Sequence, residues 1–87
     1  MVTVFIPPLL RDAVGGLEQI EVAGATVRQI VKALEARFPG VAERLCEGEG
    51  LRPGLTVAVN GTVSSLGMLQ KVPDRSEVHF LPAVGGG

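Results

Sequence analysis

The sequence predicts an α+β fold in which one amphipathic helix packs on a mixed sheet of four or five strands. One segment, residues 26–38, has the spacing of a long amphipathic helix. Several short β-branched or alternating segments, typical of strands, stand on both sides of it. The chain has 87 residues, which is the size of one domain.

Two strands are expected before the helix. Residues 2–6 are β-branched or aromatic, and Pro7 and Pro8 end the segment. Its nearly continuous apolar character predicts a central strand that is covered on both faces. Residues 17–22 alternate between apolar and polar side chains, so we expect a second strand that pairs with the first.

The helix has the clearest signals. Thr26 and Gln29 have the spacing of a capping box. Apolar residues then recur on one helical face, at Val27, Ile30, Val31, Leu34 and Phe38. Pro39 and Gly40 end the helix after Phe38. A helix with this single apolar face is expected to lie across a sheet.

The second half of the chain is expected to be mostly strand and loop. Residues 41–46 are compatible with one or two helical turns, and residues 47–54 with a flexible polar loop. Residues 55–59 alternate as a strand up to Asn60 and Gly61, a dipeptide that favours a tight turn, and residues 62–63 begin a return strand. For the apolar group that follows, packing under a loop is favoured over a recognition patch; its members are Leu66, Met68 and Leu69.

The last predicted strand is residues 77–82. Because no second long helix follows Asn60, a β-grasp with the first and last strands paired in the middle is favoured over a ferredoxin-like split βαβ fold. We therefore divide the chain into a β-grasp domain, residues 1–82, and a flexible C-terminal glycine tail, residues 83–87.

Composition excludes several classes of function. The net charge is −1, so no basic surface is expected for nucleic acid or an anionic membrane, and the chain has no Trp or Tyr on which single-stranded bases could stack. One Cys and one His argue against an internal disulfide, an iron–sulfur cluster and a histidine-rich metal site. Without a leader pattern or a long apolar run, we expect a cytoplasmic protein.

The three terminal glycines call for a functional explanation. Glycine loses the most conformational entropy on ordering and has no side chain to pack, so it contributes little to folding. Gly85, Gly86 and Gly87 are therefore either idle or a tail suited to a narrow space. Fully extended, the five residues after Pro82 reach roughly 16–18 Å.

Several segments resemble the ubiquitin-like sulfur carriers of the MoaD and ThiS type, which include the small subunit of molybdopterin synthase and the thiamine sulfur carrier. The resemblance covers nearly the whole chain. It rests on Leu10-Arg11 followed by Gly15, on residues 58–61 (Ala-Val-Asn-Gly), and on residues 74–87, which end in the diglycine. Residues 34–38, 40–45 and 82–84 look most similar to the CysO-like carriers of actinobacterial cysteine synthesis.

The resemblance implies a chemistry for Gly87. In the family, the C-terminal carboxyl is adenylated by an ATP-dependent enzyme of the ubiquitin-activating type. Sulfide from a persulfide donor then displaces AMP and leaves a thiocarboxylate. The protein would be a co-substrate and not an enzyme, with no permanently bound cofactor or metal, and ATP would be used by the activating partner.

The resemblance also implies partners. These are the activating enzyme, a sulfur donor and an acceptor enzyme. In the cysteine-synthesis branch the acceptor is a pyridoxal-phosphate cysteine synthase, and a metallopeptidase releases the product. Three alternatives stay open: the small subunit of molybdopterin synthase, a ubiquitin-like modifier joined to lysines, and a binding module with an idle tail.

Partner binding is assigned to Leu81, Pro82, Gly85 and Gly86. If Val78 and Phe80 face the core, alternation places Leu81 outside, beside the tail. The glycines would enter the partner's active site.

Two further reactive residues have simpler interpretations. For Cys46, packing is favoured over a role as a sulfur-transfer thiol. For His79, a position on the strand surface is favoured over catalysis.

Overall fold

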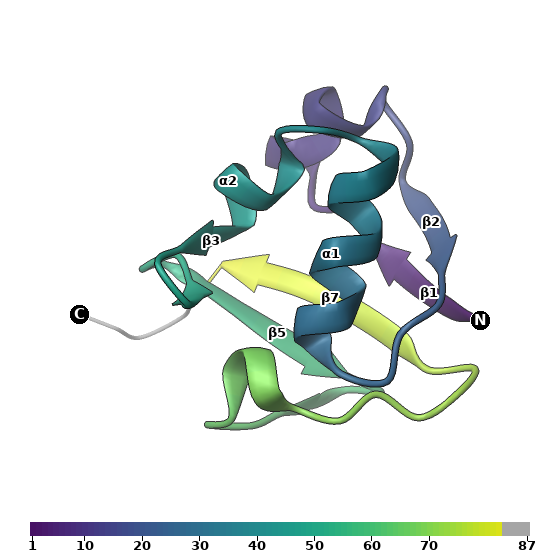
Figure 1. Cartoon of the computed structure of the whole chain (residues 1–87), viewed down its shortest axis with the longest axis vertical. Coiled ribbons are helices and arrows are strands. Elements are labelled where there is room, and N and C mark those ends of the chain that lie inside the picture. The colour runs from purple at the N-terminus through teal and green to yellow at the C-terminus, as the bar shows by residue number, and fades with distance from the viewer. Residues whose placement is uncertain (83–87) are drawn as a thin grey trace.

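A five-stranded sheet with one long helix across its face forms the body of the protein (Figure 1). The computed structural model describes residues 1–82, so the predicted tail, residues 83–87, lies outside the described residues. The strand order is β2-β1-β7-β5-β6. The bounds are β1 Val2–Phe5, β2 Gln19–Val22, β5 Leu55–Val59, β6 Thr62–Val63 and β7 Glu77–Pro82, with the long helix α1 at Val27–Arg37. The predicted α+β fold and its β-grasp topology are confirmed.

The first and last strands pair in the middle of the sheet, as predicted. β1 runs parallel to β7, with Thr3 opposite Glu77 and Phe5 opposite His79. β1 also pairs antiparallel with β2, and β7 pairs antiparallel with β5. The parallel pair requires a long crossover, which is the part of the chain that contains α1.

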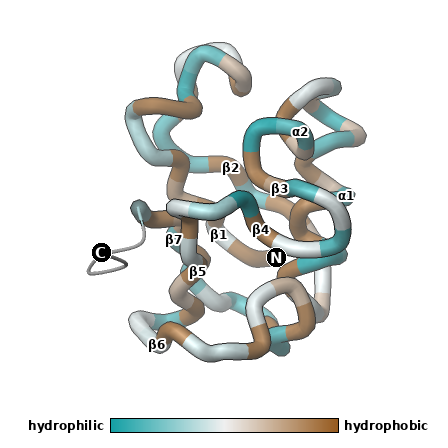
Figure 2. The backbone as a smooth tube through the Cα atoms, turned by 90° about the vertical axis from the view of Figure 1, so that its left-hand side faces the viewer, coloured by the Kyte–Doolittle hydropathy of each residue, from teal (hydrophilic) through white to brown (hydrophobic). Residues whose placement is uncertain are grey.

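The expectation that the first strand is covered on both faces is wrong. Val2 and Val4 are buried beneath the helix layer, whereas Thr3 and Phe5 on the opposite face are only half-buried. Helices α1 and α2 lie on one side in Figure 2, and β5, β6 and β7 lie on the other. The other face of the sheet stays open, and the β-branched and aromatic residues of β1 suit a half-buried strand surface equally well.

Helix α1 begins with the predicted cap. The Thr26 hydroxyl accepts a hydrogen bond from the Gln29 N–H at 3.2 Å, and the Gln29 side chain accepts one from the Ala25 N–H at 2.7 Å. Together these bonds satisfy N–H groups at the helix start. Four residues of the predicted apolar face are buried: Val27, Ile30, Val31 and Leu34. The fifth, Phe38, follows the last residue of α1 and is half-buried.

Short elements connect α1 to β5. Helix α2 (Val41–Leu45) confirms the expected helical turns. The loop expected at residues 47–54 contains instead a small antiparallel hairpin of β3 (Cys46–Glu47) and β4 (Gly50–Leu51). Gly48 has φ +65° in its turn, a conformation that glycine adopts without strain. Between β1 and β2, a 3₁₀ helix, η1 (Pro8–Val14), packs beside α2.

The tight turn after β5 also forms hydrogen bonds with the start of β7. Asn60 and Gly61 both have positive φ, as the dipeptide predicts. The Asn60 side chain accepts a hydrogen bond from the Glu77 N–H at 2.9 Å and donates one to the Ser76 hydroxyl at 3.1 Å. The Asn60 side chain therefore holds the first residues of the last strand in position.

The expected packing of the apolar group after β6 is confirmed for one residue only. Met68, in the short 3₁₀ helix η2 (Gly67–Leu69), packs against the core. Leu66 and Leu69 are 57% and 67% exposed, so the expectation that they pack under a loop is wrong. A single 3₁₀ turn cannot direct all three side chains inward.

Within residues 1–82, no helix has the length and apolar character needed to cross a bilayer.

Candidate functional site

Strand β7 carries the residues predicted to bind a partner. Val78 and Phe80 are buried at 0% and 1% exposure, so the predicted alternation is confirmed. Leu81 is 38% exposed and Pro82 is exposed at the strand end. Gly85, Gly86 and Gly87 lie outside the described residues.

The pairing of β7 extends to its last residue. On one side Leu81 is opposite Thr56 and Pro82 is opposite Leu55 of β5. On the other side, pairing with β1 ends at His79. Leu81 and Pro82 are therefore held by β5 alone, and their β1-facing edge is open.

An apolar row crosses the open face of the sheet. Strand register places four residues side by side, in the order Phe5, His79, Ala58 and Val63. The rings of Phe5 and His79 stack with centroids 4.2 Å apart and planes 3° from parallel. Leu81 lies two residues beyond His79 on the same strand face. Ala58 is buried between its neighbours in this row, so the surface consists of Phe5, His79, Val63 and Leu81. We call this surface the open sheet face.

His79 thus has the surface position that was predicted, but it is half-buried because Phe5 covers one side of its ring. The stack depends on the parallel register of β1 and β7. This register pairs two residues that are 74 positions apart in the sequence. No local sequence signal could have revealed it.

A hollow of about 420 Å³ lies at the Leu81 end of the open sheet face. Phe5, His79 and Leu81 line it. Arg11 and Glu18 stand at the same hollow, with the Arg11 guanidinium 3.9 Å from the Glu18 carboxylate. The hollow can receive an apolar side chain from a partner, with a charged pair beside it.

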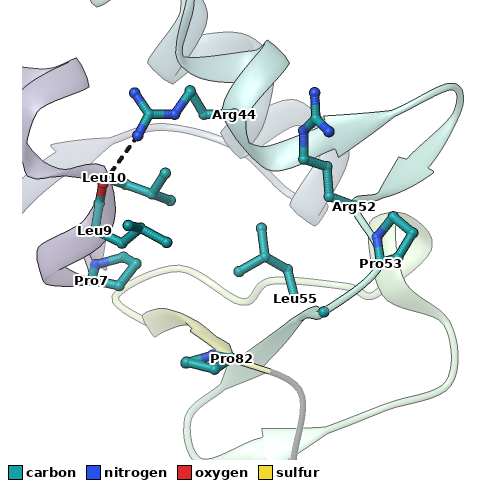
Figure 3. Close-up of a pocket in the computed structure, with 9 residues that line it drawn as sticks. Pro7, Leu9, Leu10, Arg44, Arg52, Pro53, Leu55 and Pro82 are labelled. Carbon is teal, nitrogen blue, oxygen red and sulfur yellow. Dashed lines mark hydrogen bonds between the residues drawn. The ribbon is translucent and has the colours of Figure 1, made fainter. Parts of the chain in front are cut away.

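A second hollow, of about 390 Å³, lies on the helix side of the same strand end (Figure 3). Its lining is largely apolar and comes from η1 with the residue before it, from β5 and from β7: Pro7, Leu9, Leu10, Leu55 and Pro82. Arg44 of α2 and three residues of the loop before β5, Arg52, Pro53 and Gly54, complete it. We call this the helix-side groove. Pro7 and Pro82 line both hollows.

Both arginines of the helix-side groove are held by backbone carbonyls. Arg44 Nη2 donates to the Leu9 carbonyl at 3.0 Å, the bond drawn in Figure 3. Arg52 Nε donates to the Glu43 carbonyl at 2.7 Å. Arg44 also lies 3.3 Å from the Asp12 carboxylate, and this hydrogen bond lowers the pKa of Asp12 below its usual value.

The structure places Cys46 directly after α2, as the first residue of β3, where it packs against the core. Burial raises the pKa of its thiol, which reduces the thiolate fraction at neutral pH. This supports the packing interpretation. In residues 1–82, no group of three His, Cys, Asp or Glu side chains lies close enough together to hold a metal ion.

Comparison with known proteins identifies a family. The ThiS family model matches residues 4–87. The sulfur carrier protein CysO of Mycobacterium tuberculosis is 34% identical over 91 residues, covering 99% of this chain and 98% of the relative. Small archaeal modifier protein 3 of Haloferax volcanii is 37% identical over 65 residues, covering 72% of this chain and 71% of the relative.

A solved structure is similar over the whole length. It is the BexX/CysO complex of Amycolatopsis orientalis, in which the matched chain is 39% identical, with a TM-score of 0.90 and full coverage of both chains.

Proposed function

The chain belongs to the ThiS family of ubiquitin-like sulfur carriers, and from this membership we propose that it carries sulfur on the α-carboxyl of Gly87. It acts as a protein co-substrate and not as an enzyme. One structural observation supports this most directly. β7 is paired with β1 as far as His79 and with β5 as far as Pro82, so the strand before the tail is fixed to the sheet up to its last residue.

The proposed chemistry begins with an ionised carboxylate, because such groups titrate near ~3.5. A carboxylate oxygen attacks the α-phosphorus of ATP in the activating enzyme and expels pyrophosphate. A thiol attacks the persulfide of the donor, forms a disulfide with it and releases hydrosulfide, which then attacks the acyl carbon. A carbon–sulfur bond forms, the bond to AMP breaks, and Gly87 is left as a thiocarboxylate. ATP is consumed by the partner, and we propose no bound cofactor for this chain.

The open sheet face provides the binding energy that the tail needs. Ordering five residues costs on the order of 1–2 kcal/mol for each residue, and glycines bring no side chains to offset this. Leu81 and Pro82 lie where the tail starts, beside the hollow lined by Phe5 and His79. We propose that the activating enzyme docks on this face while Gly85 and Gly86 occupy its channel.

Cysteine synthesis is the pathway that the relatives favour. The curated relative and the matched chain of the solved complex are both named CysO. We therefore propose a cysteine synthase-like acceptor enzyme. The runner-up acceptor is the large subunit of molybdopterin synthase. No nucleic acid or membrane partner is proposed.

A second function, protein modification, is favoured by the modifier relative of Haloferax volcanii. Carrier and modifier share the adenylate and differ in what displaces AMP. In the carrier the nucleophile is sulfide, and in the modifier it is a lysine amine.

Intact mass spectrometry tests these functions. The chain is incubated with its purified activating enzyme, ATP and a sulfide source, beside a control truncated after Gly85. Exchange of one oxygen for sulfur in the full chain, with no change in the control, is expected. Isopeptide-linked remnants on cellular lysines, with no sulfur exchange, would support the modifier. If the truncated chain restores cysteine synthesis to a null strain, both functions of the tail fail.

A further inference from the structure

The helix-side groove is not explained by docking on the open sheet face. It lies on the opposite side of the β7 end, with Leu10 and Leu55 from the core side of the fold. A partner bound only to Phe5, His79 and Leu81 would leave this groove exposed to water.

Leu9 is the first sign that the groove has an occupant. At 78% exposure it is the most exposed large hydrophobic side chain of residues 1–82. It extends from η1 toward Leu55 across the groove in Figure 3. Isolated exposed leucines are common, but this one lines a concave surface that is otherwise apolar.

The two arginines are the second sign. Their bonds to the Leu9 and Glu43 carbonyls hold both guanidinium groups in place before anything binds. Their ion pairs within the chain are exposed and long, at 3.3 Å from Arg44 to Asp12 and 3.7 Å from Arg52 to Glu47. Exposed pairs of this kind contribute little to stability. A carboxylate from a partner can therefore bind one of these positioned guanidinium groups at a small cost in free energy.

Continuity with the tail indicates where the occupant comes from. Pro82 lines both the helix-side groove and the hollow of the open sheet face, and so does Pro7. An enzyme that takes the residues after Pro82 into a closed channel must surround Pro82. Because Pro82 also lines the helix-side groove, the surface of that enzyme then lies next to the groove.

We propose that the helix-side groove is a second docking site, which binds a segment of the activating enzyme carrying an apolar side chain next to a carboxylate. The apolar side chain lies on Leu9 and Leu55, and the carboxylate binds Arg52 and Arg44. The partner thus holds the root of the tail from both sides. This proposal rests on the proposed function, since it needs an enzyme that accepts the tail.

Titration calorimetry with the activating enzyme, in the absence of ATP, tests the proposal. Two groove variants are used, Leu9→Ser and Arg52→Glu. The matched controls are Leu69→Ser, also an exposed leucine in a 3₁₀ helix, and Arg28→Glu, an exposed arginine of α1. We expect each groove variant to raise Kd about tenfold and Arg52→Lys, which keeps the charge, to stay within about threefold. The controls should stay within about twofold.

Other outcomes overturn the proposal. If wild type forms the thiocarboxylate and the groove variants bind like wild type, the groove is not a docking site, whereas the proposed function stands. If wild type is never charged, the proposed function itself fails. A dimer that Leu9→Ser dissociates in sedimentation would assign the groove to a second copy. Methyl shifts of Leu9 and Leu55 on truncation after Pro82, in the isolated protein, would assign it to the chain's own tail. Thermal unfolding of each variant checks that folding is retained.

Discussion

Replacing Leu81 with Ala separates what this side chain does for folding from what it does for docking. Its exposed fraction is 38%, so roughly six-tenths of it is already buried in the free protein. Only the exposed part can be buried by a partner. Burying a whole leucine contributes about 1.5–3 kcal/mol, so the exposed part contributes about 0.6–1.1 kcal/mol.

This free energy corresponds to a three- to sixfold change, since 1.4 kcal/mol is about tenfold in Kd. We therefore expect Leu81→Ala to weaken binding of the activating enzyme by about three- to sixfold, measured by titration calorimetry without ATP. Loss of the part that is already buried should lower the free energy of unfolding by about 1–3 kcal/mol, measured by urea unfolding.

The control is Leu69→Ala, because Leu69 is 67% exposed and belongs to η2. It should leave the Kd unchanged. Docking on the open sheet face is refuted if Leu81→Ala binds like wild type while its stability falls as expected. Equal weakening by both variants would place the docking surface elsewhere.

Two further predictions concern ionisable groups. The Glu35 carboxylate accepts hydrogen bonds from the Ala42 N–H at 2.9 Å and the Gly40 N–H at 3.0 Å, and these bonds lower its pKa. Its contribution to stability is therefore full above the ordinary value of 4.5 and is lost as pH falls through the folded pKa. Glu35→Gln should therefore flatten the loss of stability that urea unfolding measures as pH falls below about 4.5. For Cys46, burial raises the pKa of the thiol and so disfavours a sulfur-transfer role. Cys46→Ala should therefore form the thiocarboxylate at the wild-type rate, measured by intact mass, with a free energy of unfolding lower by about 1 kcal/mol. A Cys46→Ala chain that folds but takes up no sulfur would contradict this reading.

Local signals predicted most elements because each is strong over a few residues. Thr26 and Gln29 cap α1, and Asn60 and Gly61 form a turn with positive φ, as their side chains and backbone freedom dictate. The exposure of Leu81 followed from alternation along β7.

The wrong expectations share one cause. Apolar character shows that a residue can be buried, but not how many layers surround it. Phe5 was expected beneath a second layer, yet it lies on an open face and stacks on His79. Leu66 and Leu69 were expected to pack under a loop, yet a short 3₁₀ turn leaves them exposed.

The sequence by itself predicted the fold class, the last strand and its alternation, because helix spacing, strand alternation and turn dipeptides are signals carried by residues close together in the chain. The tertiary structure decided what surrounds the root of the tail. Parallel pairing of β1 with β7 creates the Phe5–His79 stack. The packing of η1 beside α2 brings Leu9 and Arg44 to the end of β7. Contacts between residues so far apart in sequence depend on register and packing, which no short segment encodes.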